Sequence, residues 1–109
     1  MKIKVFVRTT FEGFHRWPDA PDEVAFLRYR HRHLFHVRGE LPVGHADRDT
    51  EFILLKRELD TVIAETKGRE GENVETWSCE TWAAHLAAVM GFIKCEVSED
   101  GENGAIVEI

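Results

Sequence analysis

Residues 30–38 read RHRHLFHVR and bring three histidines and three arginines together in a chain whose net charge is −6. Successive side chains of a β-strand point to opposite faces of the sheet. A strand over residues 29–39 would therefore separate this cluster into two sets. One face would carry Tyr29, His31, His33, Phe35 and Val37, and the other Arg30, Arg32, Leu34, His36 and Arg38.

The length and composition of the chain indicate one folded domain. It has 109 residues, of which 43% are hydrophobic, a composition typical of globular proteins. The acidic balance and the lack of a long basic run argue against nucleic-acid binding. No signal peptide and no apolar run of about 18 residues is present, so we expect a cytoplasmic protein with no membrane partner. Cys79 and Cys95 form no CxxC pair and are expected to be buried thiols.

The residues on either side of the histidine cluster predict two strands separated by a loop. Residues 2–7 (KIKVFV) have the pattern of a half-buried strand. Residues 9–26 contain Gly13, Pro18, Pro21 and several aromatic residues, and are expected to form a packed loop without regular structure. The second strand is expected to close at Gly39, before Pro42.

The second half of the chain predicts two helices and a hairpin. Residues 49–66 place apolar side chains at helical spacing behind an N-cap at Asp49 or Thr50, and the expected buried stripe is Phe52, Leu55, Leu59 and Val62. A solvated loop follows at residues 68–73. Residues 78–90 predict a second helix that buries Trp82, Leu86 and Val89 and ends at Gly91. Two short strands flank a turn in DGENG, residues 100–104. The predicted order is β-β-α-α-β-β, an α+β fold in one domain over residues 1–109.

The histidine spacing suggests a metal site. Side chains two apart in a strand have Cβ atoms roughly 6–7 Å apart on one face, so His31 and His33 can converge on one ion. His15, in the preceding loop, is the candidate third ligand. Three histidines leave a coordination position open, as in catalytic zinc sites. The alternative is that these are exposed or hydrogen-bonded strand histidines, and for the arginine face that it is a solvated or protected strand surface. His45 and His85 stand alone and are expected to be structural or exposed.

Five segments together resemble one protein family. They are FEGFHRW (11–17), HRHLFHV (31–37), DTEFILLKREL (49–59), SCETWAAHLA (78–87) and CEVSEDGENGAIVE (95–108). In this order they are similar to the pyruvoyl-tetrahydropterin synthase and 6-carboxytetrahydropterin synthase (QueD-like) family over nearly the whole chain. The resemblance implies a T-fold, in which an antiparallel sheet carries a helix pair on one face. It also implies Zn²⁺ on His15, His31 and His33.

The resemblance further implies where a pterin-like or purine-like ring would bind. Glu99 matches the family's acidic residue that grips the amidine-like edge of the ring, a bidentate contact of the strong, charge-assisted kind. Ser78 and Cys79 match the pair that lines the same pocket, with Glu80 beside them. Without the resemblance, Glu80 is an ordinary acid in the first turn of a helix, and Glu99 an ordinary acid beside a turn.

The chain departs from the family pattern at the residues that perform acid–base chemistry. Residues 22–30 contain no cysteine where the family has its catalytic one, and residues 64–73 contain no histidine where the family has an Asp-His pair. Arg32 replaces the central glycine of the family's His-Gly-His. The catalytic residues are therefore unknown, with His45 and His85 as weak candidates and Glu12 and Asp22 as other acids that could substitute.

Three functional hypotheses remain open. The first is a zinc-dependent lyase or hydrolase of the QueD-like class, the second is a non-catalytic binder of a pterin, deazapurine or nucleotide, and the third is a structural oligomer with a vestigial pocket. We expect a homo-oligomer with sites between subunits, because a small sheet otherwise leaves exposed edges. The arginine face, Arg30, Arg32 and Arg38, would hold a triphosphate or carboxylate if it lines a cavity between subunits.

Overall fold

A computed structural model describes residues 1–69 and 73–109 as an α+β fold with a four-stranded antiparallel sheet. The strands are β1 (Ile3–His15), β2 (His31–Val43), β3 (Lys94–Glu99) and β4 (Asn103–Glu108), and the helices are α1 (Phe52–Lys67) and α2 (Cys79–Met90). Two short 3-10 helices, η1 (Asp22–Arg28) and η2 (Val74–Thr76), precede β2 and α2 respectively. The loop expected at residues 68–73 lies partly outside the described residues. No helix among the described residues is long and apolar enough to cross a membrane.

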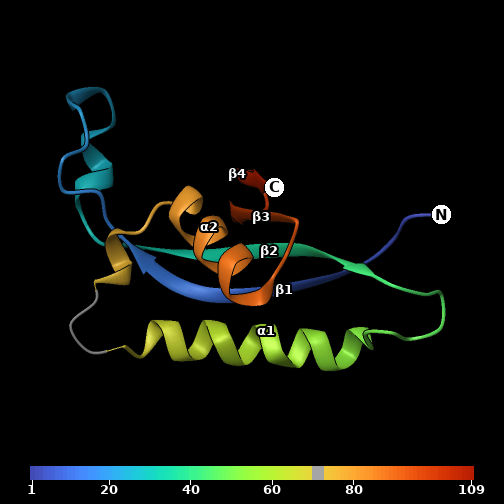
Figure 1. Cartoon of the computed structure of the whole chain (residues 1–109). Helices are drawn as coiled ribbons and strands as arrows, with labels where there is room; N and C mark the ends of the chain where they lie inside the picture. Colours follow the sequence, from blue (N-terminus) through green and yellow to red (C-terminus); the bar gives the residue numbers. More distant parts are fainter. Residues whose placement is uncertain (70–72) are drawn as a thin grey trace.

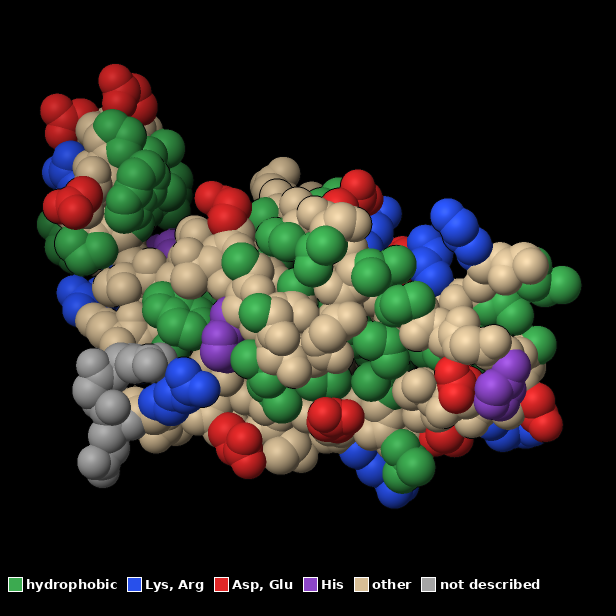
Figure 2. All heavy atoms as spheres, in the orientation of Figure 1, with side chains coloured by type: hydrophobic (Ala, Val, Ile, Leu, Met, Phe, Trp, Pro, Cys, Tyr) green, Lys and Arg blue, Asp and Glu red, His purple; other side chains and the backbone are tan. Residues whose placement is uncertain are grey.

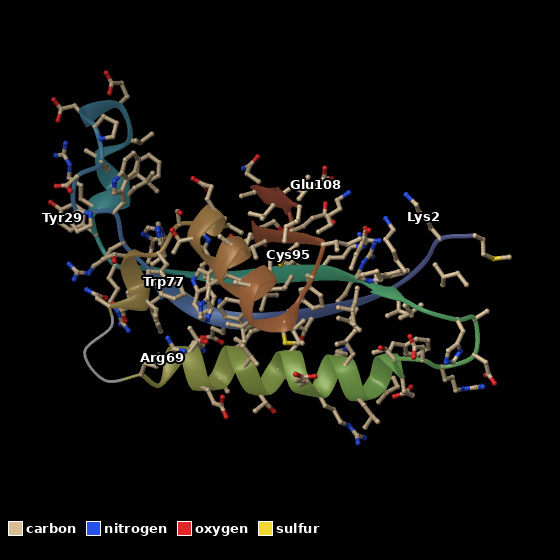
Figure 3. The ribbon with its side chains drawn as sticks, viewed as in Figure 1. Lys2, Tyr29, Arg69, Trp77, Cys95 and Glu108 are labelled. Carbon is tan, nitrogen blue, oxygen red and sulfur yellow. The ribbon has the colours of Figure 1, made fainter. Side chains whose placement is uncertain are left out.

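The sheet is built on the long pair β1 and β2. The strands lie in the order β1-β2-β3-β4, so that β1 and β4 form its edges. Both α-helices cover the same face of the sheet, as Figure 1 shows, and no helix of residues 1–69 or 73–109 covers the opposite face. The core lies between this inner face and the helices, where Cys95 is fully buried (Figure 3). Its largest fully buried side chains are Phe92, Leu59, Leu86, Val37 and Val97.

The first two strands are longer than their sequence predicts. The strand expected at residues 2–7 continues to His15, through residues expected to be irregular, and the strand expected to close at Gly39 continues to Val43. Gly13, among the signals that predict a loop after residue 7, and Gly39, where the second strand is expected to close, both lie inside strands and allow close packing instead. A Cβ on Gly13 would lie 3.0 Å from the Phe35 ring, and one on Gly39 would lie 2.2 Å from the Phe92 ring.

The helices form where they are expected, with different caps and faces in detail. The first begins after Glu51, whose carboxylate accepts a hydrogen bond from the Leu54 N–H at 2.8 Å, so neither Asp49 nor Thr50 is the N-cap. Its buried row is Leu55, Leu59, Ile63 and Thr66, while Phe52 at the helix start is 55% exposed.

The second helix ends at Gly91 as predicted, with φ at +73°. Trp82 and Leu86 are buried as expected, but Val89 is half exposed and Met90 is buried instead. The turn predicted near DGENG is also present, and both Asp100 and Gly101 adopt positive φ there. Asp tolerates this left-handed region better than most residues, so the backbone of the turn suits its sequence.

The segment between β1 and β2 projects from the body of the molecule (Figure 1). It is closed on itself by the Trp17 N–H donating to the Leu27 carbonyl at 2.7 Å, and by Arg28 Nε donating to the Ala20 carbonyl at 2.7 Å. In Figure 2 this projection has an apolar side, with acidic side chains toward its tip. Its exposed large apolar residues are Trp17, Phe26 and Tyr29.

Candidate metal centre

His15 and His31 face each other across the first two strands. They are register partners at the end of the β1–β2 pair, because β1 extends far enough to bring His15 opposite His31. His15 Nδ1 lies 3.2 Å from His31 Nε2, and the two rings meet edge to face. The sequence predicts that His15 returns beside the second strand from a loop. In the structure His15 is instead part of β1, and the pairing of β1 with β2 brings it opposite His31.

His33 lies two residues further along the same face, and its ring centre is 4.8 Å from that of His31. The three candidate histidines are therefore neighbours on the inner face of the sheet, as alternation along β2 predicts. His33 is also the register partner of Gly13, which adds no side chain beside it.

His31 and His33, the two candidate ligands on β2, are both held through Nδ1. His31 Nδ1 donates to the Tyr29 carbonyl at 2.7 Å, and His33 Nδ1 lies 2.6 Å from the Asp100 carboxylate. A neutral imidazole that donates from Nδ1 presents a lone pair at Nε2. Metal-binding histidines are oriented in this way by a carbonyl or carboxylate partner. Both rings are thus oriented by a donor bond at Nδ1, which leaves Nε2 as the nitrogen that a neutral imidazole would offer to a metal ion.

Among the described residues, the Nε2 atom of His33 has no hydrogen-bond partner. This atom is buried, and although Glu99 Oε2 lies 3.3 Å away, the contact does not have hydrogen-bond geometry. A buried polar atom without a partner is costly in a folded protein. This nitrogen is therefore the atom of the cluster that most needs a ligand.

The distances match part of a tetrahedral site. Zinc–nitrogen bonds of 2.0–2.1 Å place two ligand nitrogens about 3.3–3.4 Å apart, close to the 3.2 Å between His15 and His31. Among residues 1–69 and 73–109, no group of three or more His, Cys, Asp or Glu side chains could hold a metal ion as placed. His33 Nε2 would first have to turn from Glu99 toward the other pair.

The charges around the cluster favour neutral imidazole at His15 and ionised carboxylate at Asp100. Burial lowers the pKa of His15, and the neighbouring His31 and His33 lower it further, against the opposite effect of Glu99. The pKa of Asp100 is lowered by the Leu34 N–H, which donates to Oδ1 at 2.9 Å, and by His33. Metals bind neutral imidazole, so both directions suit ligation.

The structure places the four predicted substrate-binding residues in different settings. Glu99 lies beside His33, as described. Ser78 is the N-cap of α2 and accepts from the Thr81 N–H at 3.1 Å, so its hydroxyl has a structural role. Glu80 is exposed in the first turn of α2. Cys79 is buried, and burial with the nearby Glu99 and Glu80 raises the pKa of its thiol to about 11. A thiol with such a pKa is not a ready nucleophile at neutral pH.

A small aromatic cavity lies on the β1 side of the cluster. It has a volume of about 290 Å³ and is lined by Phe11, Phe35 and Trp82, together with Gly13, the partner of His33. Phe11 and Phe35 are stacked with ring centres 5.0 Å apart. Flat apolar walls suit a flat heterocycle. None of the four predicted substrate residues lines this cavity. Its aromatic walls were not predicted from the sequence.

The two weak catalytic candidates lie away from the histidine cluster or are engaged elsewhere. His45 follows β2 at the end opposite to His31, is 60% exposed and lies 3.4 Å from Asp49. His85 is on α2, where its Nε2 lies 3.0 Å from the Thr66 hydroxyl.

The acids that could substitute for the missing catalytic residues are both ion-paired. Glu12 pairs with Arg32 at 2.7 Å, which lowers the Glu12 pKa, and Asp22 pairs with Arg28 at 2.8 Å. Within the described part of the chain, none of these groups touches the three histidines.

The three arginines of the predicted anion-binding face are also ion-paired within the chain. Arg30 binds Glu75 at 3.0 Å, and Arg32 binds Glu12. Arg38 contacts Glu40 and lies 3.5 Å from Glu96. These contacts neutralise much of the positive charge that the sequence places on this face.

Comparison with known proteins adds no relative. No protein-family model matches the chain, and no curated protein matches it significantly. The family resemblance therefore depends on the motifs and on the arrangement described above.

Proposed function

We propose that this chain is a zinc-binding T-fold protein of the QueD-like kind, with His15, His31 and His33 as ligands and a pterin-like or purine-like ring as substrate. The observation that carries the proposal is the Nδ1 contact that orients each of His31 and His33. His31 is tied to a carbonyl and His33 to a carboxylate, each through Nδ1. The unpartnered Nε2 of His33 supports the same proposal.

Each residue of the cluster has a separate task in this proposal. The three imidazoles hold the ion, which when bound would polarise a carbonyl or hydroxyl of the ligand or lower the pKa of a water. Asp100 orients His33. Glu99, whose carboxylate is partly exposed beside the cluster, accepts two N–H bonds from the amidine-like edge of the ring. Glu99 does not line the aromatic cavity of Phe11 and Trp82, so this cavity would hold the part of the ring that lies beyond the amidine-like edge.

A non-catalytic binder on the same scaffold is the second candidate. It is favoured by the acid–base groups of the described residues, because the thiol of Cys79 has a raised pKa, His85 is engaged by Thr66, and His45 lies beyond the far end of β2. A lyase or hydrolase reaction needs a proton donor or acceptor within reach of the ligand. Binding needs only the zinc, the acid and the ring cavity.

We further propose that the protein is a homo-oligomer with its sites between subunits. Each edge strand, β1 and β4, has one outer edge without a neighbouring strand among the described residues, and β1 is 13 residues long. Long exposed edges are templates for pairing with another chain. Edge pairing between copies would complete the sheet and enclose the histidine end of β1.

Metal content tests the zinc assignment. Protein purified without added metal should contain about one zinc per chain by mass spectrometry, and His15→Ala and His31→Ala should each lose it. His45→Ala is the matched control and should retain the metal. Zinc-free wild-type protein, or zinc retained by His31→Ala, would contradict the assignment, provided that circular dichroism shows each variant folded.

Ligand assays separate the two candidate functions. Zinc-loaded protein is incubated with pterin triphosphates, and both bound ligand and products are followed by mass spectrometry. Turnover supports the lyase or hydrolase, whereas saturable binding without product supports the binder. Glu99→Gln should weaken either outcome by about tenfold or more, because the charge-assisted pair is lost.

A further inference from the structure

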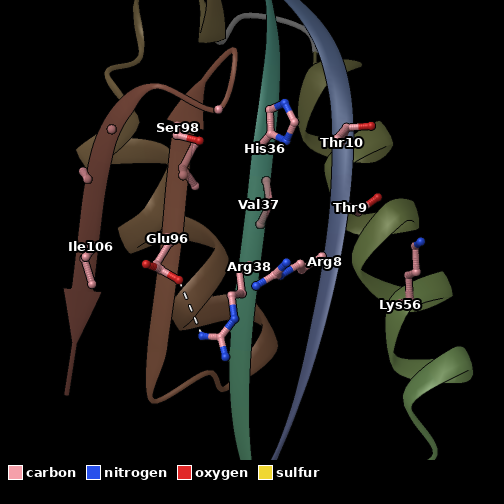
Figure 4. Close-up of a pocket in the computed structure, with 14 residues that line it drawn as sticks. Arg8, Thr9, Thr10, His36, Val37, Arg38, Lys56, Glu96, Ser98 and Ile106 are labelled. Atoms are coloured by element: carbon pink, nitrogen blue, oxygen red, sulfur yellow. Dashed lines mark hydrogen bonds and ion pairs between the residues drawn. The ribbon is translucent and has the colours of Figure 1, made fainter.

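The face of the sheet opposite to the helices holds a second, larger cavity. It has a volume of about 640 Å³ and lies over the middle of the four strands, with α1 at its flank (Figure 4). Its cationic and polar lining comes from Arg8, Thr10, His36, Arg38, Lys56 and Ser98. The histidine cluster lies on the other face, so the two sites share strands but no lining residue.

Two arginines meet in this cavity. Arg8 and Arg38 are register partners on β1 and β2, and Figure 4 shows the Arg8 side chain reaching toward β2 and Arg38. Their guanidinium carbons lie 5.8 and 4.5 Å from the centre of the same Phe6 ring. Like charges directly opposite in a sheet destabilise it. An anion bound between the two guanidinium groups would attract both of them and so offset their mutual repulsion.

The charge of Arg8 and Lys56 is not neutralised within the described residues. Arg38 is compensated by Glu40 and by Glu96, which also lines the cavity. Arg8, by contrast, lies over the Phe6 ring, and neither Arg8 nor Lys56 forms an ion pair with a described residue. Two uncompensated cations thus line one cavity of an acidic chain, Arg8 reaching toward β2 and Lys56 standing on α1 beyond β1 (Figure 4).

Hydrogen-bond donors continue beside the arginines. Thr10, His36 and Ser98 are register partners on three neighbouring strands. This row lies two residues along from Arg8 and Arg38, on the same face of the sheet. The next partner in this row is Gly104, which adds no side chain. A row of hydroxyl and imidazole groups next to guanidinium groups can bind several oxygens of one oxyanion.

We infer that this cavity binds a phosphate-bearing small molecule, with Arg8 and Lys56 as its principal charge contacts. The phosphate group accepts from the Arg8 guanidinium and the Thr10 hydroxyl, with Lys56 attracting it from the α1 side of β1, and Ser98, two strands from Thr10, is left for the rest of the molecule. The volume exceeds that of a free phosphate and is within the usual range of small-molecule sites. The apolar side chain of Ile106, at the β4 side of the cavity, would contact the organic part.

The test measures binding of inorganic phosphate and of pyrophosphate by isothermal titration at constant ionic strength. Wild type should bind saturably with one site per chain, and Arg8→Gln and Lys56→Gln should each weaken binding by about tenfold, the effect of one charge-assisted hydrogen bond. Arg57→Gln removes the same charge from the neighbouring exposed position of α1 and should change affinity less than about twofold. His31→Ala should bind like wild type, since this site does not depend on the proposed metal.

The outcomes distinguish this site from the alternatives. Equal losses in Arg57→Gln and Lys56→Gln would mean a diffuse charge effect and would overturn the inference, as would the absence of saturable binding by wild type. Binding abolished by His31→Ala would assign the phosphate to the metal centre and also overturn it. Binding retained by His31→Ala but weakened by Arg8→Gln would support the inference whether or not the chain binds zinc.

Discussion

The contact between Asp100 and His33 gives the sharpest test of the metal centre. Asp100→Asn removes the negative charge that lies 2.6 Å from His33 Nδ1. The turn should persist, because Asn adopts positive φ as readily as Asp and its amide oxygen can still accept from the Leu34 N–H. The change is therefore confined to the orientation and basicity of His33.

The expected size follows from the role of such carboxylates. Losing the outer partner of a metal-binding histidine costs 10–100-fold in metal affinity, which corresponds to about 1.4–2.8 kcal/mol. Zinc affinity is measured by competition with a chromophoric chelator, and folding by the thermal transition. Glu102→Gln, in the same turn, removes one charge without touching His33 and should bind zinc like wild type.

Two results would refute the reasoning. Zinc affinity of Asp100→Asn within twofold of wild type would show that the carboxylate does not orient a metal ligand. An equal loss in Glu102→Gln would show that only the net charge of the turn matters. If wild type binds no zinc, the metal assignment itself fails, which the metal-content measurement detects separately.

Three further predictions concern the fold and the assembly. Gly39→Ala should lower the free energy of unfolding by about 2–3 kcal/mol, because the new Cβ would lie 2.2 Å from the ring of the fully buried Phe92. Gly68→Ala, whose nearest neighbour would be 3.5 Å away, is its control in the same denaturant titration, and similar losses in both would contradict the packing argument. Lys4 and Arg38 bind the Glu40 carboxylate and lower its folded pKa to about 2. The stabilisation of the fold by these contacts is therefore complete above the unfolded pKa of about 4.3, and it is lost as pH falls toward 2. Glu40→Gln should flatten the dependence of the thermal transition on pH between 5 and 2, and an unchanged slope would count against this role. Light scattering after size-exclusion chromatography should give a multimer at micromolar concentration, and a stable monomer would contradict edge pairing.

The sequence predicted which residues share a face better than it predicted where strands end. Alternation along residues 31–37 placed His31 and His33 with Phe35, and these residues do lie on the inner face. The first strand was predicted to end at Val7, before a loop marked by Gly13, Pro18 and Pro21, and the second at Gly39, but both strands continue through these glycines. A glycine that breaks a strand and a glycine that packs against an aromatic ring from a distant part of the chain look alike in the sequence. Only tertiary contacts distinguish the two cases.

The candidate site was predictable in part for the same reason. His15 was named as the third ligand, but its place opposite His31 follows from the register of two 13-residue strands, which burial of residues such as Phe11 sets. Asp100 was missed as a partner of His33 because the two are 67 residues apart. An aspartate before glycine also has a sufficient local explanation as a turn residue.

The alternation of β2 has a consequence for insertions and deletions. The strand presents His31 and His33 to the helix side, and His36 and Arg38 to the open side, so both proposed sites depend on one phase of the pleat. One residue added between His33 and Phe35 would send every side chain beyond it to the opposite face, or else displace the histidines. Two added residues would restore the phase. This strand should therefore tolerate changes in length by pairs of residues far better than by single ones.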